Sequence, residues 1–101
     1  MKRIPLVKLS LDELEANAAS ETILSGWVTQ GPQVAAFEQE FTRLVGAAYA
    51  CAVCNCTAAL HLALKAVGVS PGDEVITVSY SFLATANAIR YLDATPVFID
   101  I

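Results

Sequence analysis

Charged side chains are scarce in this sequence. Only 16% of its 101 residues are Asp, Glu, Lys or Arg, whereas about 25% is usual for soluble domains. The six Lys and Arg residues are scattered and the net charge is −4, so no basic run is present that could neutralise a nucleic-acid backbone, and we expect no nucleic-acid partner. Because 55% of the residues are hydrophobic, the composition indicates a piece of a larger core rather than a complete small domain.

Long apolar runs are also missing. The most hydrophobic stretch, residues 44–69, is interrupted by His61 and Lys65 and lacks the continuous run of about 18 apolar residues that indicates a membrane-spanning helix. The first residues turn acidic early and lack the apolar core of a secretory signal. These features predict a cytoplasmic protein without a membrane partner.

Cysteine is limited to Cys51, Cys54 and Cys56. An odd, clustered set is a poor disulfide framework, which fits a reducing compartment. Together with His61 the three thiols could form a zinc ligand set, but their spacing is cramped and contains no knuckle glycine. We therefore expect no metal site, and we expect the cysteines to be small buried side chains.

The apolar pattern predicts two helices followed by alternating strands and helices. The first helix is expected to begin at Ser10, where Ser10 and Glu13 match a capping box, and to stop at Gly26. The second carries an apolar stripe over residues 34–44, with Glu38 and its polar neighbours facing away. The later elements are predicted as a strand over 49–53, a helix over 57–67, a strand over 74–78, a helix over 82–92 capped by Ser81, and a strand from 96 to 101.

This alternation is typical of an α/β fold with parallel strands and right-handed crossovers. The strands are nearly continuous apolar runs, so we expect a sheet that is covered on both faces. The chain stops inside the last apolar strand, and natural sheets rarely leave such an edge exposed. We therefore expect residues 1–101 to be one incomplete domain, truncated at its C-terminal end and poorly soluble or partly disordered by itself.

The segment 54–60 joins a predicted strand to an alanine-rich helix. Ligands of open α/β sheets bind beyond the carboxyl ends of the strands, and the free amides of a helix N-terminus suit a phosphate group. Thr57 adds a hydroxyl donor, and Ala58 allows a close approach. An ordinary capped helix start, with Asn55 or Thr57 as the cap, explains the same residues equally well.

The segment 78–82 follows the next strand and should reach the same edge of the sheet. Phe82 could stack there on a flat cofactor ring, although the pattern alone favours an ordinary core residue. His61 has no carboxylate partner nearby in the sequence, which favours a structural role. The sequence contains neither a G-x-G-x-x-G motif nor a Walker loop, so dinucleotide and triphosphate binding have no local support.

Three strings resemble the DegT/DnrJ/StrS family of pyridoxal-phosphate (PLP)-dependent sugar aminotransferases: SGWVTQGPQVAAFEQEF, NCTAALHLAL and PGDEVITVSYSFLATANAIRYLDATPVFIDI. The resemblance runs from about Ile4 to Ile101. It implies the N-terminal part of the large domain of a fold-type I aminotransferase, a three-layer α/β/α domain with a mainly parallel sheet. For the whole protein it implies a homodimer that transfers an amino group, from glutamate as the amino-acid donor, to a nucleotide-linked keto-sugar during cell-surface polysaccharide or secondary-metabolite sugar biosynthesis.

The resemblance also assigns cofactor-binding residues. It places Cys56, Thr57 and Ala58 at the PLP phosphate and Phe82 on the PLP ring, and it places the segment 27–32 in a loop near the active site. The family often has glycine where this chain has Cys56, which matters only if the position needs a glycine-only conformation.

No catalytic residue is expected within these 101 residues. In the family, the lysine that carries the cofactor and the carboxylate that pairs with its pyridine nitrogen lie well downstream, and neither has a counterpart here. The lysines of this chain are Lys2, Lys8 and Lys65, and Lys65 belongs to the polar stripe of a helix, where a solvated role is usual. The chain alone is therefore predicted to be inactive. Two alternatives stay open: a PLP-dependent sugar dehydratase of the same family, and a non-catalytic truncated binding or regulatory protein.

Overall fold

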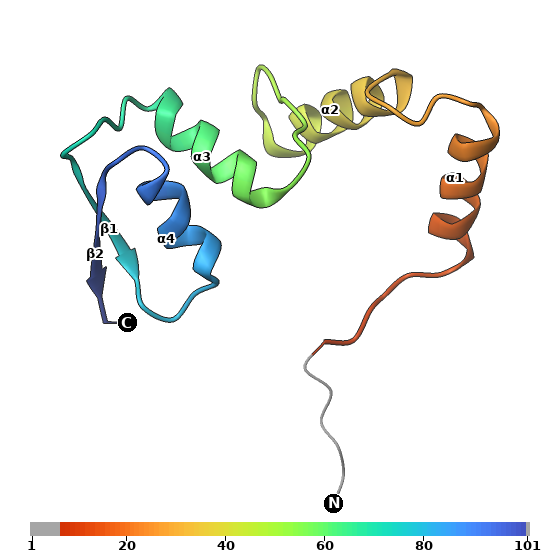
Figure 1. Ribbon diagram of the computed structural model, residues 1–101. Helices are drawn as coiled ribbons and strands as arrows, with labels where there is room; N and C mark the ends of the chain where they lie inside the picture. The colour runs from red at the N-terminus through yellow and green to blue at the C-terminus, as the bar shows by residue number, and fades with distance from the viewer. Residues whose placement is uncertain (1–6, 101) are drawn as a thin grey trace, which may run out of the picture. The chain divides into compact units, whose positions relative to one another are not determined.

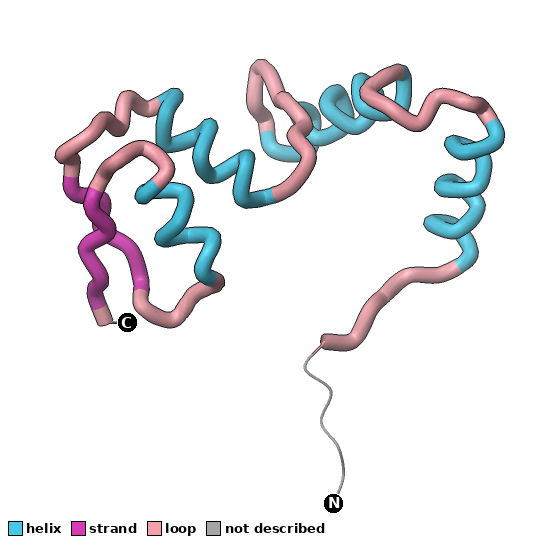
Figure 2. Tube along the Cα trace, viewed as in Figure 1, coloured by secondary structure: helices cyan, strands magenta, loops and turns pink. Residues whose placement is uncertain are grey.

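The computed structural model describes residues 7–100, and four helices and two strands form within them (Figures 1 and 2). In chain order these are α1 (Glu13–Leu24), α2 (Pro32–Val45), α3 (Cys56–Ala66), β1 (Glu74–Val78), α4 (Leu83–Arg90) and β2 (Thr95–Ile99). The chain divides into two compact units, one up to Ala52 and the other from Val53 onward.

Helix α1 begins later than predicted, because Asp12 rather than Ser10 is its N-cap. The Asp12 Oδ1 atom accepts a 2.8 Å hydrogen bond from the amide of Leu14, and the amide of Asp12 donates to Glu15 Oε2 at 2.9 Å. This is the predicted kind of capping box, shifted by two residues. A carboxylate is favourable at this position because it faces the positive end of the helix dipole. Gly26 follows the helix with a left-handed φ of 74°, at the predicted stop.

Helix α2 agrees with the prediction. Pro32 is its first residue, where the missing N–H has no intrahelical acceptor in any case, and Gly46 ends it with a left-handed φ of 69°. The rings of Phe37 and Phe41, which belong to the predicted apolar stripe, lie 5.9 Å apart. Both rings remain about half exposed. They line a hollow together with residues of the segment 47–52.

The predicted strand over residues 49–53 does not form. Side chains bind the backbone of Ala52 instead: its amide donates to Glu38 Oε1 at 2.7 Å, and its carbonyl accepts from Gln30 Nε2 at 3.5 Å. A strand needs a neighbouring strand to satisfy its backbone. Within residues 7–100 the paired strands are β1 and β2, and residues 49–53 pair with neither of them.

The second unit confirms the predicted α/β class. Strands β1 and β2 are parallel, with Glu74 opposite Thr95, and the intervening helix α4 packs against both strands and against α3 (Figure 1). Ahead of β1, the exposed carboxylate of Asp73 closes a turn by accepting a 2.8 Å hydrogen bond from the amide of Ser70. Asp73 therefore belongs to a solvated surface turn.

The two helices of this unit lie within two residues of their predicted bounds, but the cap of α4 differs. Phe82 is the N-cap residue and makes no side-chain capping bond. The hydroxyl of Ser81, which was expected to cap the helix, lies 2.9 Å from the hydroxyl of Thr85. No helix within the described residues combines the length and the apolar composition that crossing a bilayer would take.

The buried core is small. Among the described residues, the buried apolar side chains are those of Ala88, Ile89 and Ala94, on α4 and just before β2. The sheet keeps Ile76 at 67% and Phe98 at 55% exposure, so the expected cover on both sheet faces is absent within residues 7–100. The reason is that burying both faces of a sheet takes an element on each face.

Candidate functional site

The N-terminus of α3 is capped by Asn55. Its Oδ1 atom accepts a 2.9 Å hydrogen bond from the amide of Ala58, and its backbone carbonyl accepts from the amide of Ala59 at 3.1 Å. Of the two caps that the sequence allowed, the structure has Asn55. The amide of Ala58 is therefore occupied, and this removes one of the three backbone donors that the sequence offered to a phosphate.

Two donors remain at this helix end. Within the described residues, the amides of Cys56 and Thr57 have no hydrogen-bond acceptor. The first turn of α3 contains no acidic residue, whereas α1 fills its own N-terminus with the carboxylates of Asp12 and Glu15. No acidic side chain of the first turn faces the positive end of the α3 dipole, and an arrangement of this kind can accept an anion. Thr57 in the same turn is half-buried and carries a hydroxyl.

Cysteine is compatible with the first position of α3. Asp93 is the sole non-glycine residue in the described part of the chain with a positive φ, at 55°. Cys56 is therefore in an ordinary helical conformation, and no glycine is needed at this position. The departure from the family's frequent glycine leaves the backbone donors in place.

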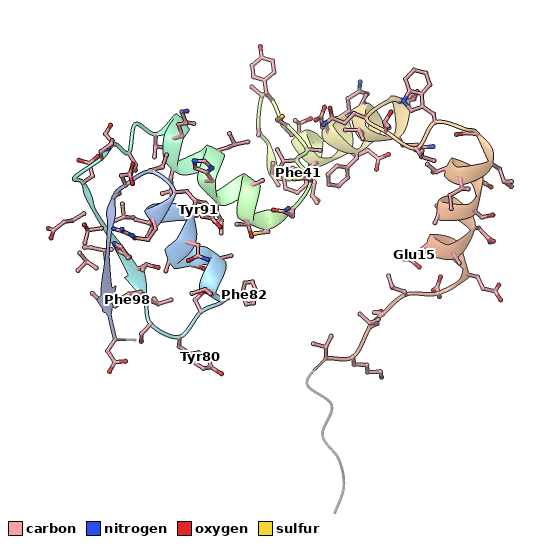
Figure 3. All side chains as sticks on the ribbon, in the orientation of Figure 1. Glu15, Phe41, Tyr80, Phe82, Tyr91 and Phe98 are labelled. Carbon is pink, nitrogen blue, oxygen red and sulfur yellow. The ribbon has the colours of Figure 1, made fainter. Side chains whose placement is uncertain are left out.

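Phe82 lies between β1 and α4, and its side chain is 80% exposed. Figure 3 shows its ring projecting away from the two strands. The expectation of an ordinary core residue is therefore wrong. The loop around Phe82 encloses a hollow lined by Ser79, Tyr80 and Ser81, and a ring left free in this way can cover a flat ligand.

The phosphate-type donors and Phe82 lie on different helices of the same unit. Helices α3 and α4 pack together, so one small α/β framework carries both. A second hollow beside Phe82 is lined by Ser79, Thr85 and Phe98, but not by Cys56 or its neighbours. Within the described residues, the two candidate elements are therefore not closed into one pocket.

The thiols of the three cysteines and the ring of His61 were the other candidates for chemistry. All three cysteines are exposed, so the expectation that they are buried is wrong. The ring of His61 makes an edge contact with Tyr91, at a centroid distance of 5.7 Å and an interplanar angle of 65°, which is a packing role. Among residues 7–100, no three metal-ligating side chains are gathered together.

Sequence reasoning missed Glu38. Its place on the polar side of the second helix suggested a solvated side chain, yet it is half-buried and accepts the amide of Ala52. The two residues are 14 positions apart, and no local pattern marks such a contact. The only hint in the sequence was that Glu38 lies beside the apolar stripe of the helix. Glu40 also lies near that stripe but is exposed, so this hint does not identify the residue that binds Ala52.

Known proteins resemble this chain along most of its length. The profile of the DegT/DnrJ/EryC1/StrS aminotransferase family matches residues 9–101. The spore coat polysaccharide biosynthesis protein SpsC of Bacillus subtilis (strain 168) is 56% identical over 87 residues, which are 86% of this chain and 22% of SpsC. The UDP-4-amino-4-deoxy-L-arabinose–oxoglutarate aminotransferase of Shewanella sediminis (strain HAW-EB3) is 41% identical over 98 residues, which are 97% of this chain and 25% of that protein.

Two solved structures share the arrangement. Spr1654 from Streptococcus pneumoniae, in its PLP form, is 33% identical with a TM-score of 0.86, over 99% of this chain and 26% of that protein. The GDP-4-keto-6-deoxy-D-mannose-3-dehydratase of E. coli, with bound hydrated PLP, is 27% identical with a TM-score of 0.85, over 100% of this chain and 28% of that protein. The chain thus spans about a quarter of the length of the proteins that it matches.

Proposed function

Because the chain belongs to the DegT/DnrJ/EryC1/StrS aminotransferase family, we propose that it is the N-terminal part of the large domain of a PLP-dependent sugar aminotransferase. The whole protein would exchange the keto oxygen of a nucleotide-linked sugar for the amino group of glutamate, releasing 2-oxoglutarate and an amino sugar. The likeness to SpsC and to an oxoglutarate aminotransferase supports this substrate pair. We also propose that the whole protein is a cytoplasmic homodimer.

The observation that carries the proposal is the N-terminus of α3. Its two unpaired amides, at Cys56 and Thr57, and its acid-free first turn fit the phosphate of PLP. The hydroxyl of Thr57 would donate a third hydrogen bond. Ala58 would contribute a small side chain rather than its amide, because Asn55 holds that amide.

Phe82 would lie against one face of the cofactor ring. The ring of Phe82 is exposed to water, so it lacks the stabilisation that burial gives an aromatic side chain. Contact with a flat ligand would bury the ring. PLP, when bound, supplies the electron sink for amino-group transfer. The residues of this chain would hold its phosphate and cover its ring.

We expect none of the described lysines to supply the cofactor-carrying amine. Lys65 lies nine residues after Cys56 on the same helix, so the two positions are separated by about 14 Å along the helix axis. That is too far for one small cofactor to contact both the α3 amides and Lys65. Lys2 lies outside the described residues, and the family resemblance gives neither Lys2 nor Lys8 this role. We propose that the lysine comes from the remainder of the whole protein and that this chain alone is inactive.

A second candidate is sugar dehydration with the same cofactor. The E. coli dehydratase matches this chain with a TM-score of 0.85, nearly the same value as Spr1654. The residues that bind the cofactor phosphate do not distinguish the two reactions. The residue at the lysine position does, because a histidine there could not hold the cofactor covalently.

The test uses the purified whole protein with PLP, glutamate and a nucleotide-linked 4-keto-sugar. Amino-group transfer predicts equal amounts of 2-oxoglutarate and amino sugar, and a lysine that borohydride links to the cofactor. Dehydration predicts a deoxy-keto sugar and no trapped lysine. A whole protein that neither binds PLP nor converts the sugar would leave the non-catalytic alternative.

A further inference from the structure

Glu38 on α2 accepts a hydrogen bond from the backbone of Ala52. Among the described residues of the first unit, this is the shortest side-chain hydrogen bond between residues far apart in the chain. The Oε1 atom of Glu38 accepts the amide of Ala52 at 2.7 Å in a partly buried setting. Gln30 Nε2 adds a longer contact of 3.5 Å to the carbonyl of the same residue. Both polar groups of one residue in an irregular segment are therefore held from α2 and from the loop before it.

This contact lies close in the chain to the proposed phosphate site. Ala52 precedes the helix cap Asn55 by three residues, a span of at most about 10 Å of extended chain. Val53 and Cys54 connect them without regular structure. Fixing the backbone of Ala52 therefore restricts the conformations that are open to the turn leading into α3.

We propose that Glu38 is a positioning residue for the cofactor phosphate, an inference that rests on the proposed function. Its carboxylate fixes Ala52, so that the turn before Cys56 is already ordered when the phosphate arrives. Ordering a loop in advance improves affinity because binding no longer has to order it. A carboxylate suits the task, because a hydrogen bond to an ionised acceptor is about twice as strong as a neutral one.

The helix offers a matched control. Glu40 lies two residues further along α2 and is exposed, and its carboxylate makes no hydrogen bond or ion pair within the described residues. Glu38→Ala removes the acceptor, Glu38→Gln keeps a neutral acceptor oxygen, and Glu40→Ala removes the same charge without touching Ala52. A purely electrostatic effect of charge on α2 would affect the variants at both positions.

The experiment measures the affinity of the whole apoprotein for PLP and for pyridoxal, which lacks the phosphate. We expect Glu38→Ala to weaken PLP binding about tenfold and to leave pyridoxal binding unchanged, since phosphate binding would then have to order the turn itself. Glu38→Gln should recover part of the loss, and Glu40→Ala should match the wild type.

Two results would overturn the inference: unchanged PLP affinity in Glu38→Ala, or an equal loss for PLP and pyridoxal, which would indicate a general structural role. If Glu38→Ala does not fold, amide hydrogen exchange over residues 53–57 is measured for Glu38→Gln and for the wild type. A positioning role predicts faster exchange in the variant. Unchanged exchange rates would reject that role. Thr57→Val separates the two proposals. If it weakens PLP binding while Glu38→Ala does not, only the positioning role fails, and if neither variant matters, the proposed phosphate site fails.

Discussion

The side-chain oxygen of Asn55 lies 2.9 Å from the amide nitrogen of Ala58. Through this bond α3 satisfies one of its own terminal donors and leaves the two preceding amides free. A helix cap and the proposed anion site therefore share a single turn of the chain. The two can be separated experimentally. The cap depends on the side chain of Asn55, whereas the proposed anion site depends on the amides of Cys56 and Thr57 and on the hydroxyl of Thr57.

Replacing Asn55 tests the cap. Asn55→Ala should lower the stability of the apoprotein by about 1 kcal/mol, the usual loss for a missing N-cap, as measured by its thermal midpoint. Asn55→Asp should retain that stability, because aspartate caps equally well. The added negative charge should nevertheless weaken PLP binding, because it faces the phosphate. An aspartate variant with unchanged PLP affinity would argue against a phosphate at this turn.

Replacing Thr57 tests the phosphate contact itself. Thr57→Val keeps the shape of the side chain and removes the hydroxyl, so PLP affinity should fall about tenfold to a hundredfold, as expected for a hydrogen bond to a charged group. Thr57→Ser should retain most of the affinity. Thr42 provides the control, because its hydroxyl donates to the carbonyl of Gln39 at 2.7 Å within α2. Equal effects at both threonines, in a titration of the apoprotein, would refute the assignment.

Replacing Phe82 tests the stacking role. Phe82→Ala should weaken PLP binding about threefold to tenfold, which corresponds to the contribution of an aromatic pair, while the apoprotein keeps its thermal midpoint because the ring is 80% exposed. Phe82→Tyr should bind PLP normally. Tyr80, which is 90% exposed and two residues away, is the matched control. If Phe82→Ala lowered the thermal midpoint but left PLP affinity unchanged, Phe82 would be a packing residue and not a stacking residue.

Gly31 tests the loop before α2. A Cβ at this position would overlap the indole ring of Trp27, whose Nε1 donates to the carbonyl of Gln30 at 2.9 Å. We expect Gly31→Ala to lower the stability of the whole protein by about 1–3 kcal/mol through overpacking. The double variant with Trp27→Ala should lose less than the sum of the two single variants, and a double-mutant cycle measures this coupling. Simple additivity would mean that the ring can move aside.

The isolated 101-residue chain tests the proposal of an incomplete domain. Most of its large apolar side chains are exposed, and within residues 7–100 the buried apolar residues are Ala88, Ile89 and Ala94. We expect this chain to bind a hydrophobic dye, to unfold over a broad temperature range, and to give no borohydride-stable PLP adduct at Lys65. A sharp cooperative transition or a specific adduct would contradict this expectation.

Much of the local structure could be predicted from residue order. The spacing of apolar residues predicted α2, α3 and β1 almost to the residue, because helices and their caps are built from contacts three or four positions apart. Where two local patterns competed, sequence reasoning chose wrongly. Ser10 and Asp12 each begin a capping-box pattern in the sequence. The prediction chose Ser10, whereas Asp12 is the N-cap of α1 in the structure.

The sequence by itself determined the family, the α/β class and the bounds of α3 to within one residue, since each depends on residues that are neighbours in the chain. Only the tertiary structure decided that residues 49–53 form no strand, that Phe82 is exposed, and that Glu38 binds Ala52. These three features depend on what lies across from a residue in space. An apolar segment becomes a strand, or an aromatic ring becomes core, only when a partner is present to satisfy its backbone or to cover its surface.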